Sequence, residues 1–349
     1  MTEHVSARVV LPSPPSSPEP ENDENEEVSS DFLDSWPATT LELDLVHCRL
    51  GSLDPLQLPR FAQHLKRLCV RQNHISALEP LALSSLILLE ELDVYDNKLK
   101  NSGITTLPAS LITLDLSFNL LKHVPDVLES LPNLETVYFV QNRISRIEHL
   151  GMCTKLKSLE LGGNRIRDIT SLSSLTALEE LWLGKNKITT IPPGALTPLT
   201  SLHILSLQSN RLTRITGMEG LVNLQELYLS HNGIEKLEGL QDNVGRSFPF
   251  NVDGLTDTQV NLSTLDIGNN FVPAIEGIDH LAQLEELWMN NNNIPASVLS
   301  SPFPDLPALR TIYLEGNPCQ KADPVNYRRK VMLALPQVTQ IDATYVKAA

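Results

Sequence analysis

Apolar and polar residues recur in a fixed order from residue 41 onward. Each unit reads L-x-x-L-x-L-x-x-N-x-L, with a basic period of 22 residues. Apolar residues that alternate with polar ones predict a short strand with one buried face. The asparagine follows the strand, where its amide can bond backbone groups that the turn leaves unpaired. Cys48 takes the asparagine position in the first unit, and eleven asparagines follow: Asn73, Asn97, Asn119, Asn142, Asn164, Asn186, Asn210, Asn232, Asn270, Asn292 and Asn317.

A second apolar position lies five residues after the asparagine and closes the back of each unit. Its members include Ile147, Ile169, Ile191, Ile215, Leu237 and Ile275. The return segment is too short for a long helix, so we expect 3-10 turns or short helical pieces. The pattern predicts an α/β fold: a leucine-rich-repeat solenoid, or horseshoe, with parallel strands on its concave face. Residues 35–317 would form one elongated domain of twelve repeats.

Both ends of such a solenoid need a cover. Phe32, Leu33, Trp36 and Leu41 can lie over the first coil. Residues 318–349 read as a C-terminal cap. Asp323-Pro324 predicts the start of a helix that Pro336 ends, with one face made of apolar residues: Tyr327, Val331, Met332 and Leu335. Val338 to Ile341 then returns as an extended segment.

Two stretches depart from the repeat. Residues 241–261 are an insertion of polar and turn-forming residues, which predicts a loop; its Phe248 and Phe250 could dock on a partner or pack back on the solenoid. Residues 1–34 carry five prolines and the acidic run ENDENEE, so we expect a disordered tail. Ser13-Pro14 and Ser17-Pro18 there fit proline-directed kinases, or belong to a plain solvated tail.

The charge is acidic and unevenly distributed. Of the formal net charge of −15, residues 1–34 hold −8, which leaves −7 for the rest. A pI near 5.0 argues against a nucleic-acid partner. With no apolar stretch long enough for a membrane helix or a signal peptide, we expect no membrane association and a protein that stays inside the cell.

Motifs that carry catalytic chemistry are absent from the sequence. It contains no GxxxxGK[ST], GxGxxG, HExxH or GxSxG, and its nine histidines show no metal-ligand spacing. The four cysteines form no CxxC pair, and we expect free thiols that pack in the core. We therefore expect a non-catalytic protein without cofactor or metal.

The outward positions of the strands carry an unusual composition. Four residues before each asparagine, five of twelve residues are acids, five are Trp or Tyr, and none is Lys or Arg. Six residues before it stand Glu42, Glu91, Glu180, Glu226 and Glu286, with Arg67 as the one base. Exposed aromatic residues beside one sign of charge are typical of a protein-binding hot spot. The acids would steer a convex partner rich in Lys or Arg.

Individual repeats and the end of the chain point to a family. The repeats LGKNKIT (183–189), LQSNRLT (207–213) and LYLSHNGIE (227–235), and the end YRRKVMLALPQVTQIDATYV (327–346), resemble the regulatory subunit 7 family of protein phosphatase-1. The resemblance covers about residues 40–346. The sequence departs from the family at the insertion and at the Pro-rich start of the tail.

The resemblance implies a regulatory subunit that holds the protein phosphatase-1 catalytic subunit on its concave face. It further implies a location in nucleus and cytoplasm, a role in mitotic chromosome segregation and a ternary complex with a small phosphatase inhibitor. The family's contact positions fall on Asp115, Tyr138, Glu160, Trp182, Asp266, Glu286, Trp288 and Tyr313. Tyr138 and Trp182 stand where the family tends to have Phe.

Two other classes of function remain open from the residues alone. A leucine-rich-repeat scaffold of another complex, of spliceosomal or dynein type, would share the fold. It has no reason to share the cap sequence or the acid–aromatic positions. An enzyme would need a catalytic cluster, and the sequence offers none. Whether binding activates or inhibits the phosphatase does not follow from the sequence.

Overall fold

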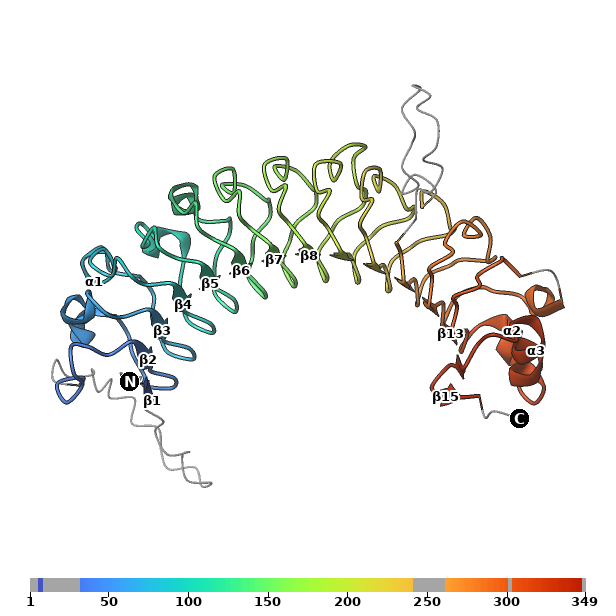
Figure 1. The fold of residues 1–349 in the computed structure, drawn as a ribbon, viewed down its shortest axis with the longest axis horizontal. Helices are drawn as coiled ribbons and strands as arrows, with labels where there is room; N and C mark the ends of the chain where they lie inside the picture. Colours follow the sequence, from blue (N-terminus) through green and yellow to red (C-terminus); the bar gives the residue numbers. More distant parts are fainter. Residues whose placement is uncertain (1–5, 9–31, 241–260, 301–302, 347–349) are drawn as a thin grey trace. The chain divides into compact units, whose positions relative to one another are not determined.

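A three-residue strand precedes every predicted turn, as the alternation of apolar residues indicates. The computed structural model describes residues 6–8, 32–240, 261–300 and 303–346. They belong to two compact units, unit 1 (Met1–Leu156) and unit 2 (Lys157–Ala349). The structure confirms a leucine-rich-repeat solenoid built of parallel strands and short helical pieces (Figure 1).

The strands of the repeats pair in parallel and in register, so that buried leucines stack on one another, as Leu43 does on Leu68. The last pair, β14 with β15, is antiparallel. Unit 1 contains β1 (Ser6–Arg8), β2 (Glu42–Asp44), β3 (Arg67–Cys69), β4 (Glu91–Asp93), β5 (Thr113–Asp115) and β6 (Thr136–Tyr138). Unit 2 contains β7 (Ser158–Glu160), β8 (Glu180–Trp182), β9 (Ile204–Ser206), β10 (Glu226–Tyr228), β11 (Thr264–Asp266), β12 (Glu286–Trp288), β13 (Thr311–Tyr313), β14 (Gln340–Ile341) and β15 (Thr344–Tyr345).

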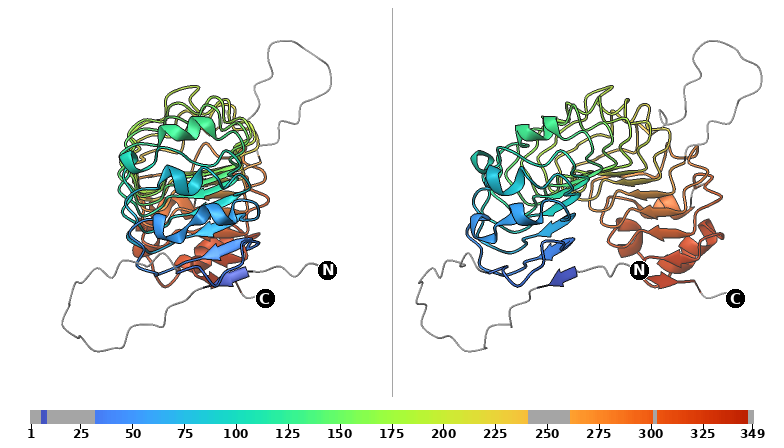
Figure 2. Two further views of the ribbon diagram at one scale, coloured as in Figure 1. Left: turned by 90° about the vertical axis from the view of Figure 1, so that its left-hand side faces the viewer. Right: turned by 60° about the vertical axis from the view of Figure 1, so that its left-hand side comes forward.

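The return segments contain only short helical pieces, as their length predicts. In unit 1, α1 lies on the side of the coils away from the strands (Figures 1 and 2). The pieces are η1 (Asp54–Leu56), η2 (Leu58–Phe61), α1 (Pro80–Leu83), η3 (Asn101–Gly103) and η4 (Asp126–Ser130) in unit 1, and η6 (Ala296–Ser300), α2 (Pro318–Lys321) and α3 (Tyr327–Ala334) in unit 2. The predicted second apolar position is buried, with Ile191 and Ile215 each 1% exposed.

The asparagines bond the turn backbone, as predicted. Asn119 donates to the carbonyl oxygens of Val94, Leu116 and Ser117 at 3.0–3.2 Å and accepts from the Leu99 N–H at 2.9 Å. The residue before it, Phe118, has φ 53°, a left-handed conformation that turns the chain out of the strand. One amide thus joins two neighbouring coils.

At the N-terminal end, the structure differs from the expectation of a wholly disordered tail. Strand β1 pairs in parallel with β2, so at least residues 6–8 cover the first edge of the sheet. Of the predicted cover residues, Leu33 is buried (1% exposed), whereas Phe32 and Trp36 are half-buried. The Arg60 guanidinium holds this segment by donating to the carbonyl oxygens of Leu33 and Trp36. Residues 9–31 lie outside the described part.

The C-terminal cap contains the predicted helix with two corrections. Helix α3 begins at Tyr327 rather than at Pro324, because Asp323 caps the preceding turn, accepting from the Asn326 N–H at 3.2 Å. Tyr327, Val331 and Leu335 are buried, but Met332 is 40% exposed. One residue turns a helix by about 100°, which takes residue 332 off the buried face. Beyond the helix, β14 pairs in parallel with β13, and β15 pairs antiparallel with β14 as the last strand of the sheet.

The predicted insertion loop, with Phe248 and Phe250, lies almost wholly outside the described residues, which resume at residue 261. All four cysteines are buried free thiols, as predicted. None of the helices in the described ranges has the length and apolar character of a membrane-spanning helix.

Candidate binding surface on the strands

The outward side of the strands, here called the strand face, carries all eight predicted contact residues. Asp115 and Tyr138 lie on β5 and β6 of unit 1. The other six lie on unit 2: Glu160, Trp182, Asp266, Glu286, Trp288 and Tyr313. Unit 2 alone therefore presents a surface of four aromatic side chains, since Tyr228 on β10 joins Trp182, Trp288 and Tyr313.

Two aromatic rings from non-adjacent strands of unit 2 stack above the strand that lies between them. Trp182 on β8 and Tyr228 on β10 both pair in register with Ser206 on β9. Their ring centroids are 6.2 Å apart and the planes differ by 20°. Ser206 beneath them is 1% exposed. The small residue on the middle strand allows the two rings to stack above it.

A second aromatic pair lies at the C-terminal end of unit 2. Trp288 and Tyr313 sit on the paired strands β12 and β13, with ring centroids 5.3 Å apart. The Gln340 amide of the cap donates to the Tyr313 hydroxyl oxygen at 3.0 Å. The C-terminal cap therefore positions a residue of the strand face.

A glutamate two residues before the aromatic residue fixes its orientation. The Trp182 Nε1–H donates to Glu180 Oε2 at 3.2 Å, and the Trp288 Nε1–H donates to Glu286 Oε2 at 3.1 Å. Residues i and i+2 of a strand share one face, which makes this contact local. The same relation in a third strand joins the Tyr228 hydroxyl to Glu226 at 2.7 Å. Burial and this glutamate both raise the pKa of Tyr228.

The aromatic residues are less exposed than the sequence suggests. Trp182, Tyr228, Trp288 and Tyr313 are all half-buried rather than exposed. Ring stacking and the glutamate contacts cover part of each side chain. A partner would meet ordered ring edges and faces, so little side-chain freedom would be lost on binding.

Aspartates of the strand face are held by the backbone two residues on. Asp115 Oδ1 accepts from the Ser117 N–H at 2.8 Å, and Asp266 Oδ1 accepts from the Gly268 N–H at 3.0 Å. Asp266 is 7% exposed, which corrects the expectation that it points freely into solvent. Burial raises the pKa of Asp266, and hydrogen bonds from Ser230 and the Gly268 N–H oppose that rise.

Three of the predicted residues line one hollow of about 580 Å³ in unit 2. Asp266, Trp288 and Tyr313 form part of its wall. His231, Asn291 and Glu315 complete the side on which the asparagine turns lie. The arrangement combines aromatic rings with carboxylates, which suits a cationic side chain.

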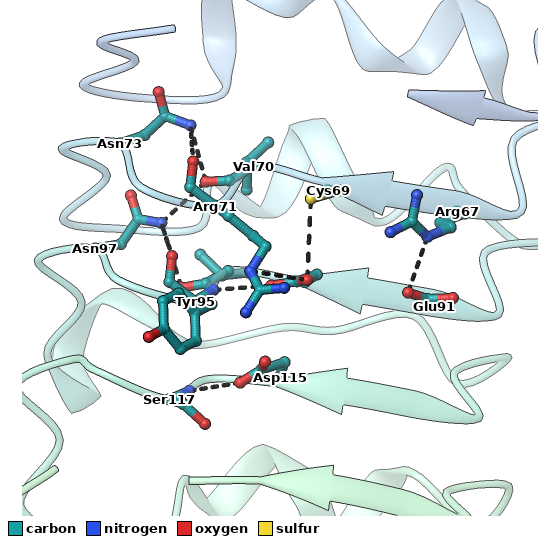
Figure 3. A network of polar contacts seen from close by, with 12 residues as sticks. Arg67, Cys69, Val70, Arg71, Asn73, Glu91, Tyr95, Asn97, Asp115 and Ser117 are labelled. Carbon is teal, nitrogen blue, oxygen red and sulfur yellow. Dashed lines mark hydrogen bonds and ion pairs between the residues drawn. The ribbon is translucent and has the colours of Figure 1, made fainter. Parts of the chain in front are cut away.

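Unit 1 contains a polar network that the sequence analysis did not identify (Figure 3). The Arg71 guanidinium lies 4.2 Å from the Tyr95 ring centroid and 3.4 Å from Asp93 Oδ2. Tyr95 in turn packs on Phe118, with centroids 4.8 Å apart. The signal in the sequence was an aromatic residue two positions before the asparagine, which lies outside the two sets of outward strand positions where aromatic residues were sought.

Asp93 is the buried centre of this network, 7% exposed. Burial, and next to it the charge of Asp115, raise its pKa to about 6, against the lowering effect of the Tyr95 N–H and Arg71. Burial likewise raises the pKa of the Cys69 thiol to about 12. A thiol with such a pKa stays protonated at neutral pH, which fits a packing role.

The described residues offer no metal centre, since no group of three or more His, Cys, Asp or Glu side chains there could hold an ion. What the arrangement can do is bind: aromatic rings, oriented carboxylates and an open hollow lie on one face of unit 2. Asp115 and Tyr138 belong to unit 1, and the other six predicted contact residues belong to unit 2.

Comparison with known proteins confirms the resemblance found in the sequence. Residues 176–234 match the leucine rich repeat family. The chain is 43% identical over 100 residues to protein phosphatase 1 regulatory subunit SDS22 of Saccharomyces cerevisiae, over 28% of this chain and 29% of that protein. It is 38% identical over 131 residues to the protein phosphatase 1 regulatory inhibitor subunit PPP1R7 homolog of Arabidopsis thaliana, over 36% and 39% of the two chains. The matched parts thus span well under half of these relatives.

Solved structures agree on the fold. An internalin of Listeria monocytogenes, inlF, superposes with a TM-score of 0.64 at 23% identity, over 91% of this chain and 90% of that one. The relatives above are named as regulatory subunits, in agreement with the expected non-catalytic protein. The chain is a leucine-rich-repeat protein, homologous over parts of its length to the SDS22/PPP1R7 regulatory subunits of protein phosphatase 1.

Proposed function

We propose that this protein binds the catalytic subunit of protein phosphatase-1 through the strand face and regulates it. The observation that carries the proposal is the set of half-buried aromatic residues on unit 2. Trp182 and Tyr228 among them are oriented by Glu180 and Glu226, which are not among the contact positions that the family resemblance implies. Trp182 and Trp288 would act as anchors that fill partner pockets. Asp115, Tyr138, Glu160, Asp266, Glu286 and Tyr313 would complete the contact surface.

The charge of the strand face supports a basic partner. The positions six, four and two residues before each asparagine together carry eleven acids and two bases, far from the near-neutral balance of an ordinary surface. A single sign of charge speeds association with an opposite partner and disfavours wrong orientations. The phosphatase surface that docks here would be convex and rich in Lys or Arg. The effect on phosphatase activity would depend on whether this protein, once bound, covers the catalytic site of the phosphatase or leaves it open.

The test is a pull-down with purified protein phosphatase-1 catalytic subunit. Wild type is compared with Trp182→Ala, with Trp288→Ala and with Trp36→Ala. Trp36 is a half-buried tryptophan of the N-terminal cover and serves as the matched control, because its truncation removes the same side chain away from the strand face.

Retention by wild type and the Trp36 variant, with loss in the two strand-face variants, supports the proposal. Equal retention by all four proteins refutes the strand face as the site. Retention by none refutes the phosphatase as partner and favours the alternative, a leucine-rich-repeat scaffold of another complex.

Further parts of the proposal rest on the family resemblance alone. We propose a nuclear and cytoplasmic protein that acts in mitotic chromosome segregation and can join a ternary complex with a small phosphatase inhibitor. Fluorescent tagging at the C-terminus and depletion during mitosis test the first two points. Normal chromosome segregation after depletion would contradict the mitotic role.

A further inference from the structure

Basic residues gather at one place in the repeat, the first, third and fourth positions after the asparagine. In the three coils of Asn97, Asn119 and Asn142, these nine positions hold five bases and no acid. The bases are Lys98, Lys100, Lys122, Arg143 and Arg146, here called the basic flank. All five are exposed, and all lie in unit 1. In a protein with a net charge of −15, such a concentration is unexpected.

The basic flank lacks the acids that would neutralise it. Among the described residues, no ion pair joins any of the five bases to an acid, whereas Lys66 and Arg67 of the same unit pair with Glu90 and Glu91. Neighbouring coils of a solenoid lie about 5 Å apart, so Lys100 and Lys122 repel each other. A bound anion would remove that repulsion.

A hollow of about 230 Å³ lies between these two lysines. It is lined by Lys100, Asn101, Ser102, Leu120, Lys122 and His123. The Asn101 amide fixes its wall: Oδ1 accepts from the Lys122 N–H at 2.9 Å, and Nδ2 donates to the His123 carbonyl oxygen at 2.7 Å. The hollow therefore has an ordered backbone, and the two lysine side chains extend from it.

We propose that the basic flank binds a phosphorylated, acidic segment of a partner protein, with the phosphoryl group in the hollow between Lys100 and Lys122. A phosphoserine carries about two negative charges and three acceptor oxygens, and each lysine offers three donors. Lys98, Arg143 and Arg146 would meet acidic residues that flank the phosphoserine.

The charges of unit 1 favour a protein segment over a nucleic acid. A nucleic acid would bring a long row of phosphates, and the strand face of unit 1 holds acids such as Asp44, Asp93 and Asp115 that would repel it. A short segment with one phosphoryl group needs only the flank. This site is distinct from the strand-face site and does not depend on the phosphatase proposal.

The probe is a fluorescein-labelled synthetic peptide with one phosphoserine between pairs of glutamates, measured by fluorescence anisotropy with the full-length protein. Lys100→Ala/Lys122→Ala should weaken binding at least tenfold. The matched control is Lys155→Ala/Lys321→Ala, which changes the net charge equally at exposed lysines outside the flank. The unphosphorylated peptide should bind at least tenfold more weakly, and affinity should fall with salt.

If the two double variants weaken binding of the phosphopeptide equally, the proposal is overturned, because the peptide is then attracted by net charge and not by a defined site. Equal binding of the two peptides would overturn the phosphoryl subsite. Tighter binding of a single-stranded RNA oligonucleotide with the same loss on mutation would assign the flank to nucleic acid instead. Thermal unfolding and circular dichroism of the Lys100→Ala/Lys122→Ala variant check that it is folded.

Discussion

The indole ring of Trp182 stacks on the phenol ring of Tyr228 although their strands do not pair with each other. The centroids are 6.2 Å apart, and Ser206 on the strand between them is covered almost completely. A residue of ordinary size on that strand would keep the rings apart. The stack therefore depends on three consecutive coils, and no single repeat specifies it.

Trp182→Ala should weaken phosphatase binding by about 2 kcal/mol or more, because it removes an anchor and uncovers Ser206. It should also destabilise the protein by about 1 kcal/mol, the typical value of an aromatic pair. Trp182→Phe keeps the stack and loses only the Nε1–H donor to Glu180, so it should retain most of the affinity. Isothermal titration calorimetry with the catalytic subunit measures the affinity of both variants. Similar losses of affinity in Trp182→Ala and Trp182→Phe would contradict the stacking argument.

Glu160→Lys should slow association with the phosphatase and reduce its dependence on salt. Glu160 lies on β7 of the acidic strand face, and steering by charge acts mainly on the association rate. Stopped-flow measurements at low and high salt provide the rates. Glu276→Lys, at an exposed acid of unit 2 outside the strands, is the control. If both variants slow association equally, net charge rather than the strand face does the steering.

The period of the repeat was predictable because each coil is built from its own 22 or so residues. Alternation placed the strands of the repeats, β2 to β13, and the asparagine positions placed the turns, whereas β1 lies in the segment expected to be disordered. The burial of Asp266 was not predictable in this way, since it depends on side chains from neighbouring coils. The alternation of apolar and polar residues indicates which way a side chain points, but not which side chains of neighbouring coils cover it.

The aromatic residues illustrate the same limit within the site. Their positions on the strand face followed from the sequence, but their mutual contacts did not. Trp182 and Tyr228 are 46 residues apart in the chain. Tyr95 and Phe118 escaped notice because one stands nearer the turn than the positions searched for aromatic residues, and the other lies in the turn itself, at φ 53°. Chemistry at turns depends on backbone conformation, which a strand pattern does not describe.

Asn292→Ala should destabilise unit 2 by about 1–3 kcal/mol, the cost of leaving buried polar groups unpaired. Its amide donates to the carbonyl oxygens of Ile267 and Met289 and accepts from the Val272 N–H, with no distance above 3.2 Å. Asn223→Ala is the control, because this exposed asparagine makes one bond, to the Thr200 carbonyl oxygen. Urea unfolding of both variants measures the difference, and comparable effects would argue against a structural role for the asparagine position.

Asp93→Asn should change how the stability of unit 1 depends on pH. In the folded protein, burial raises the pKa of Asp93 from 3.8 to about 6. This rise corresponds to about 3 kcal/mol by which the folded protein favours the protonated over the ionised carboxyl group. Between these pH values the folded state binds more protons at this site than the unfolded state. The contribution of Asp93 to stability is therefore present below pH 4 and is lost as the pH rises through 6.

The asparagine variant has no carboxyl group to titrate at this position and can still accept from the Tyr95 N–H through Oδ1, as Asp93 does at 3.0 Å. It gives up the ion pair with Arg71, at 3.4 Å, which offsets part of the gain at neutral pH. Unfolding curves from pH 4 to 7 should thus show a smaller loss of stability with rising pH in Asp93→Asn than in wild type. Asp96→Asn, at an exposed neighbour, should follow wild type. Parallel curves for wild type and Asp93→Asn would mean that Asp93 is ionised throughout this range and that Arg71 outweighs burial.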